Sequence, residues 1–84
     1  MDLKTFPQVI VNVHVREKPP LEQIPAVAEA IAAAQSQLAE SGRIVIRYSG
    51  TESLARVMIE AESEPLMRHH ATAIADAIRN ELGV

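Results

Sequence analysis

The stretch GRIVIRYSGTESLARVMIEAE, residues 42–62, contains two short apolar runs separated by a polar turn. In the second run Val57, Ile59 and Ala61 recur at every second position, which is the side-chain period of a strand with one buried face. The first run, residues 43–48, is rich in β-branched side chains, and the turn contains Gly50. The stretch therefore predicts a β-hairpin whose strands cover residues 43–48 and lie within 53–62.

The segment before the hairpin predicts a further strand and a helix. Val9, Val11, Val13 and Val15 alternate with other residues over 8–16, which indicates a half-buried strand with a valine core face. From residue 25 the apolar period changes to that of a helix, and Gly42 is the expected stop. The helical stripe consists of Val27, Ile31, Ala34 and Leu38.

The segment after the hairpin predicts a second helix. Ser63 is a suitable N-cap, Pro65 fits the first turn, and Gly83 ends the pattern. The apolar stripe between them consists of Met67, Ala71, Ile74, Ile78 and Leu82.

This β-α-β-β-α order predicts an α+β fold, a two-layer sandwich with both helices on one face of an antiparallel sheet. If the first helix returns the chain so that strands one and two run the same way, strand three runs opposite to both. Placing it between them gives the order 1-3-2. We expect three to four strands, with a short fourth strand in the first residues.

Composition narrows the classes of function. The 84 residues carry a net charge of −3 and no cysteine, which argues against a polyanion-binding surface, a disulfide framework and a thiolate metal site. Phe6 and Tyr48 are the only aromatic residues, so a base-stacking platform for RNA is disfavoured. No signal-like or membrane-spanning apolar run is present, and we expect one soluble domain, residues 1–84, in a reducing cytoplasm.

The turn of the hairpin has the chemistry of a phosphate clamp. Ser49 and Thr51 offer hydroxyl groups, and Arg47 and Arg56 flank the turn. Gly50 allows either sign of φ, so we expect consecutive backbone N–H groups of the turn to face one ligand. A planar guanidinium group can donate two parallel hydrogen bonds to the oxygens of one phosphate group, so this arrangement suits a dianion. The same residues also fit an ordinary hairpin turn with two solvated arginines, and chemistry alone leaves both interpretations open.

The same stretch resembles the C-terminal phosphate-binding segment of the α-D-phosphohexomutase family. The family pattern is Gly-Arg, an apolar run, Arg-x-Ser-Gly-Thr-Glu-Pro and then Arg-Val-Met, and residues 42–52 and 56–60 are similar to it. Residues 6–8 and 12–13 also resemble the strand that opens the last domain in this family, so the resemblance extends over nearly the whole chain. Within the family, the branch that interconverts glucosamine 6-phosphate and glucosamine 1-phosphate is the most similar. The resemblance implies the fold of the phosphoglucomutase C-terminal domain, which is TBP-like.

The functional expectations rest on this resemblance alone. It implies that the chain is the fourth domain of a phosphohexomutase, an isomerase of carbohydrate metabolism that serves peptidoglycan precursor synthesis. The family transfers a phosphoryl group between an enzyme phosphoserine and the sugar, with Mg²⁺ held by an aspartate-rich loop. This chain has neither the serine motif nor that loop. The resemblance therefore implies that the chain contains no catalytic residues and no metal ligands, and that the domain alone is inactive. The implied partners are the other domains and a phosphosugar, with no nucleic acid and no membrane.

The resemblance assigns binding of the non-reacting phosphate to matched positions in the turn. They are Arg47, Ser49, Gly50, Thr51 and Arg56. Glu52 is also matched and is expected to orient an arginine or to bind a sugar hydroxyl. Two positions depart from the pattern: Ser53 replaces a proline, and Tyr48 stands where proline or a basic residue is common.

The three histidines are expected to be surface or interface residues. His69 and His70 are adjacent on a predicted helix, which is poor geometry for binding one metal ion, and we expect both to be solvated. His14 lies on the polar face of the first strand and is expected at an interface with another domain.

Two rival functions belong to other classes of protein. One is a stand-alone small-ligand-binding regulatory module of ferredoxin-like build, which would not explain paired arginines around Ser-Gly-Thr. The other is an RNA-binding domain, for which the chain lacks aromatic residues and a Gly-x-x-Gly loop.

Overall fold

The structure, a computed structural model, describes residues 6–38 and 42–83. The elements in chain order are β1 (Gln8–His14), a single 3₁₀ turn η1 (Leu21–Gln23), α1 (Pro25–Leu38), β2 (Gly42–Tyr48), β3 (Leu54–Ala61) and α2 (Glu64–Leu82). The predicted β-α-β-β-α order is confirmed. The expected fourth strand falls on residues 1–5, which lie outside the described residues.

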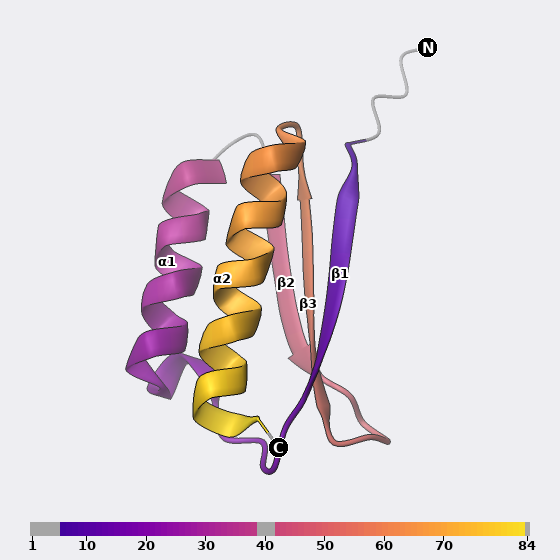
Figure 1. Cartoon of the computed structure of the whole chain (residues 1–84), viewed down its shortest axis with the longest axis vertical. Helices are drawn as coiled ribbons and strands as arrows, with labels where there is room; N and C mark the ends of the chain where they lie inside the picture. The colour runs from indigo at the N-terminus through magenta and orange to yellow at the C-terminus, as the bar shows by residue number, and fades with distance from the viewer. Residues whose placement is uncertain (1–5, 39–41, 84) are drawn as a thin grey trace.

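The sheet has the order β1-β3-β2 with both pairings antiparallel, as predicted. Figure 1 shows α1 and α2 side by side on one face of this sheet. In the described part of the chain no helix covers the opposite face, which we call the open face. Residues that point outward from the three strands can only gather there.

The first strand is shorter than predicted, because β3, the strand with which it pairs, begins only at Leu54. β1 stops at His14, which pairs with Leu54 at the start of β3. The backbone N–H of Val15 then donates to the Ser53 carbonyl, and that of Arg16 to the Leu82 carbonyl at the end of α2. The chain thus leaves the sheet and joins the C-terminus of α2.

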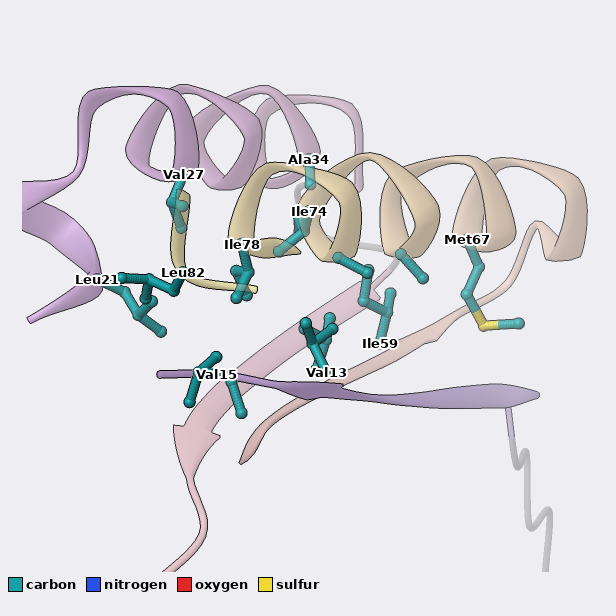
Figure 2. Packing of buried hydrophobic residues seen from close by; sticks show 14 of the residues in the cluster. Val13, Val15, Leu21, Val27, Ala34, Ile59, Met67, Ile74, Ile78 and Leu82 are labelled. Carbon is teal, nitrogen blue, oxygen red and sulfur yellow. The ribbon is translucent and has the colours of Figure 1, made fainter. Parts of the chain in front are cut away.

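The core lies between the sheet and the two helices. Figure 2 shows Ile74 and Ile78 of α2 near Ile59 and Val13 of the sheet. All five predicted residues of the α2 stripe are buried, whereas Ile31 of the α1 stripe is only partly buried. The inward positions of the central strand are fully buried: Ala55, Val57, Ile59 and Ala61.

Ser63 and Gly83 bound α2 as predicted, whereas the role predicted for Gly42 was wrong. Ser63 caps α2, with its hydroxyl oxygen accepting a hydrogen bond from the Leu66 N–H at 3.4 Å. Gly42 is the first residue of β2, not the residue that ends the first helix. A Cβ atom at Gly42 would lie 3.0 Å from both the Glu60 carbonyl oxygen and the Leu38 Cβ. Glycine is needed there because α1 and β3 approach closely.

The expectation that His70 is solvated was also wrong. Its side chain is only 6% exposed, and its Nε2 atom has no hydrogen-bond partner. The physical reason is helical spacing, since position 70 is three residues after Met67 and four before Ile74, both of which are buried. Burial, and then the neighbouring His69, lower the pKa of His70 below its usual range.

Candidate functional site

Arg47 and Arg56 lie directly opposite each other in the β2–β3 register, and both are exposed on the open face. The Nε of Arg56 donates a 3.1 Å hydrogen bond to Oδ1 of Asn12, its partner on β1. One row across the sheet therefore carries Asn12, Arg56 and Arg47. Sequence reasoning missed Asn12 as a contact of Arg56, although its outward position on the first strand was visible in the alternation.

The charges of these two arginines are not balanced by carboxylates in the described residues. The ion pairs there are Arg68 with Glu64 and Arg79 with Asp76, and both lie on α2. Like charges directly opposite each other on a sheet repel, so the arrangement costs stability unless an anion joins it. The Arg47–Arg56 pair is therefore a localised positive site on a chain of net charge −3.

The turn between the strands is ordered largely by Ser49. Its hydroxyl oxygen accepts hydrogen bonds from the backbone N–H groups of Thr51 at 3.3 Å and Glu52 at 3.1 Å. Its own N–H donates to the Leu54 carbonyl at 2.9 Å. The expectation that consecutive N–H groups of this turn face a ligand was wrong for Thr51 and Glu52, because both are used inside the turn.

A hollow of about 310 Å³ opens beside the turn. Four of the five predicted phosphate-binding residues line it together with Tyr48: Arg47, Ser49, Gly50 and Arg56. Thr51 and the supporting residue Glu52 are exposed on the turn and do not line it. A second hollow of about 380 Å³ shares both arginines and continues over Ile10, Val45 and Met58 on the open face.

Gly50 does not adopt a backbone conformation that only glycine favours. Its φ lies outside the left-handed region, and a Cβ atom built there would meet no atom within 4 Å. The structure therefore gives no steric reason for glycine at this position. The space that a Cβ would occupy remains open beside the two arginines.

The connection between β1 and η1 supplies two contacts that sequence reasoning missed. Lys18 Nζ donates a 2.7 Å hydrogen bond to the Ser49 carbonyl, and the Tyr48 hydroxyl donates to the Pro19 carbonyl. Burial raises the pKa of Tyr48, with smaller contributions from Glu17 and Glu22, which keeps this hydroxyl protonated. No local sequence signal pointed to Lys18, because its partner is 31 residues away.

Two features are absent from the described residues, a cluster of metal-binding side chains and a membrane-spanning helix. Within 6–38 and 42–83, no three histidine, cysteine, aspartate or glutamate side chains come together as ion ligands. No helix in these ranges combines the length and the apolar character needed to cross a membrane.

Sequence comparison gives a family match and close relatives. The family model for the phosphoglucomutase/phosphomannomutase C-terminal domain matches residues 10–77. A phosphoglucosamine mutase of Koribacter versatilis is 63% identical over 83 residues, 99% of this chain and 18% of that protein. A phosphoglucosamine mutase of Solibacter usitatus is 48% identical over 98% of this chain and 18% of that protein. The chain thus spans about a fifth of the length of these relatives.

Structural comparison gives related enzymes with ligands. A variant of Aspergillus fumigatus N-acetylphosphoglucosamine mutase in complex with glucose 1,6-bisphosphate matches with a TM-score of 0.72 at 32% identity. The match covers 94% of this chain and 16% of that chain. The same fungal enzyme in complex with GlcNAc-6P and magnesium matches with a TM-score of 0.68 at 32% identity, over 89% of this chain and 16% of that chain.

Proposed function

Because the chain belongs to the phosphoglucomutase/phosphomannomutase family, whose C-terminal domain it matches, we propose that it holds the phosphate group of a phosphorylated hexose. The proposed binding residues are Arg47, Ser49, Gly50, Thr51 and Arg56, with Glu52 in a supporting role. The names of the relatives support phosphoglucosamine mutase as the parent enzyme, which interconverts glucosamine 6-phosphate and glucosamine 1-phosphate. Residues 1–84 would then be its C-terminal, fourth domain.

The hydrogen-bonding state of Ser49 is the observation that carries this proposal. A hydroxyl group has two lone pairs and one hydrogen, and both lone pairs of Ser49 are engaged by the N–H groups of Thr51 and Glu52. The hydroxyl hydrogen is what remains for a ligand. Guanidinium groups also only donate, so Arg47, Arg56 and Ser49 together suit a ligand that only accepts hydrogen bonds. The dianionic phosphate group of a sugar phosphate has this property.

The role of the site is to position the substrate, since it contains no nucleophile with a general base. Charge-assisted hydrogen bonds to a phosphate group that does not react contribute by orienting the sugar for a step that occurs elsewhere. We propose that the nucleophilic serine belongs to other parts of the parent enzyme and that the domain alone is inactive.

Magnesium in the fungal relative bears on the cofactor of the parent enzyme. In such an enzyme Mg²⁺ neutralises charge on the transferring phosphoryl group. The arginines of the present site repel a cation, and the described residues contain no group of three acidic or histidine ligands. We therefore propose that the ion is held outside this chain.

A titration of the ¹⁵N-labelled 84-residue chain with inorganic phosphate tests the proposal. The open site should bind weakly, with a dissociation constant on the order of 1 mM, because water screens each contact. The amide signals of Ser49, Gly50 and Thr51 should move first, and the shifts should shrink as salt is raised.

Two variants control the titration. Combining Arg47→Ala with Arg56→Ala should abolish the shifts, whereas Arg68→Ala should leave them intact. Arg68 is near the start of α2, and the start of α2 lies at the opposite end of the molecule from the β2–β3 turn (Figure 1). Shifts that spread over the sheet but spare the turn would mean that phosphate binds elsewhere, and the proposed function would be wrong.

A further inference from the structure

Two side-chain hydrogen bonds connect the segment after β1 to the end of β2. Lys18 Nζ donates to the Ser49 carbonyl at 2.7 Å, and Tyr48 donates from its hydroxyl to the Pro19 carbonyl. Each segment donates one of the two bonds: Lys18 donates to Ser49, and Tyr48 donates to Pro19. Two adjacent residues of one segment are thus joined to two adjacent residues of the other. The joined residues Lys18 and Pro19 lie 31 and 29 positions before their partners.

The Ser49 carbonyl matters because it shares a peptide group with the Gly50 N–H. In a trans peptide the C=O and N–H bonds point to opposite sides of the chain. An ammonium group that holds the Ser49 oxygen on one side therefore keeps the Gly50 N–H on the other. Gly50 lines the hollow with Arg47 and Arg56. Within the described residues its N–H makes no hydrogen bond, unlike those of Thr51 and Glu52, so it is left as a backbone donor for a ligand.

Gly50 places little restraint on this peptide group. Glycine accepts both signs of φ with little cost, and a Cβ atom at Gly50 would meet nothing within 4 Å. The turn also carries Ser53 where the related pattern has proline, which removes a backbone restraint. The hydrogen bond from Lys18 is therefore the contact by which the structure restrains the Ser49 oxygen.

We infer that Lys18 is a positioning residue of the phosphate site, which orients the Ser49–Gly50 peptide so that the Gly50 N–H faces the bound anion. A cationic donor on the carbonyl also polarises the peptide group and strengthens the N–H as a donor. Tyr48 and the fixed φ angles of Pro19 and Pro20 hold the backbone of Lys18 at the right distance. This inference rests on the proposed function, and it assigns a role to residues outside the turn.

The rival explanation is that Lys18 binds phosphate directly as a third cation. The two explanations differ for Tyr48→Phe, which removes the bond to Pro19 and keeps every charge. They also differ for the Gly50 amide without ligand, because an orienting residue acts on it before phosphate arrives and a direct ligand does not.

The test uses ¹⁵N-labelled 84-residue chains with inorganic phosphate as the probe. In the ligand-free chain, Lys18→Met should shift the Gly50 amide signal, and Tyr48→Phe should shift it in the same direction. Both substitutions should weaken phosphate binding. For Lys18→Met we expect the dissociation constant to rise by about three- to tenfold, which is the upper part of the range for losing a partly screened charged hydrogen bond. Lys18→Arg should restore most of the affinity, and the matched control Arg68→Met should change neither measurement.

Three results would overturn the inference. The first is weaker binding in Lys18→Met with an unchanged ligand-free Gly50 amide, which indicates direct contact. The second is normal affinity in Lys18→Met, and the third is normal affinity in Tyr48→Phe. If phosphate moves no turn amide in the wild-type chain, the proposed function fails instead. The ligand-free Gly50 signal then still decides whether Lys18 orients the peptide group.

Discussion

Two pairs of arginines in this chain have the same chemistry and opposite surroundings. On α2, Arg68 pairs with Glu64 at 3.0 Å and Arg79 with Asp76 at 2.7 Å, with side chains 66% and 54% exposed. On the sheet, Arg47 and Arg56 face each other, and Arg56 contacts a neutral amide. The helix pairs are typical of a solvated surface and contribute little to stability. The sheet pair leaves positive charge unbalanced among the described residues, which supports the proposal that an anion binds there.

The largest expected effect comes from breaking the sheet pair in a complete enzyme. A chimera can carry this chain in place of the corresponding segment of the Koribacter versatilis relative, which is 63% identical. In that chimera Arg47→Ala should raise KM and lower kcat/KM, because a charge-assisted phosphate contact is lost. The fall in kcat/KM should correspond to a loss of roughly 1.5 to 3 kcal/mol in transition-state stabilisation. Steady-state kinetics measures both constants.

Arg68→Ala in the same chimera is the matched control, since it removes an exposed arginine that already has a carboxylate partner. Its kinetics should equal those of the unsubstituted chimera. Unchanged kinetics for Arg47→Ala, or an equal loss for Arg68→Ala, would contradict the distinction between the two pairs.

A second comparison, between Gly42 and Gly50, separates stability from binding. Gly42→Ala should destabilise the fold by about 1 to 3 kcal/mol, because the new methyl group would press on Glu60 and Leu38. Gly50→Ala should change the free energy of unfolding by less than about 0.5 kcal/mol, since the methyl group meets no atom. It should still weaken phosphate binding, because it fills space beside the arginines.

Urea unfolding and the phosphate titration measure these two quantities. A large loss of stability in Gly50→Ala would show that the turn needs glycine for its own backbone. Normal phosphate affinity in that variant would place the anion away from the turn.

The histidine pair contrasts an exposed side chain, His69, with a buried one, His70, and the expected effect is smaller. Because the pKa of His70 is lowered in the fold, the unfolded chain takes up its proton first as the pH falls. Stability from this group is therefore complete above the unfolded pKa of about 6.5 and is lost as the pH drops below it. Urea unfolding between about pH 7.5 and 5 should show this decline.

The decline should be reduced most in His70→Leu and only slightly in His69→Leu, because burial is the larger cause of the lowered His70 pKa and His69 the smaller one. An unchanged pH dependence in His70→Leu would mean that other groups control acid unfolding.

Local patterns were enough to predict most of the fold. Alternation in residues 9–15 and 55–61 and the stripe ending at Leu82 depend on the period of the backbone, so each segment carries its own signal. The central place of β3 could be predicted from chain direction alone. The role of Gly42 could not be predicted this way, because it is set by Glu60 and Leu38, its neighbours in space. The burial of His70 was missed although the helical spacing from Met67 and Ile74 indicates it.

The residues of the candidate site could likewise be predicted only in part. Arg47, Ser49, Gly50 and Arg56 lie within one hairpin, so their proximity could be predicted from the turn between two strands. The partners of the site, Asn12 and Lys18, come from 44 and 31 residues away, and their contacts depend on the sheet order and on the path after β1. The inward-facing hydrogen bonds of the turn were missed because they depend on its detailed conformation.

The most direct test of the central claim is the phosphate dependence of the free energy of unfolding, measured with urea in matched ionic strength of chloride. With a dissociation constant near 1 mM, about 20 mM phosphate should stabilise the wild-type chain by about 1.8 kcal/mol. The double variant Arg68→Ala with Arg79→Ala should keep this gain, and Arg47→Ala with Arg56→Ala should lose it. Loss of the gain in the helix variant, or its persistence in the sheet variant, would show that the unbalanced pair is not the phosphate site.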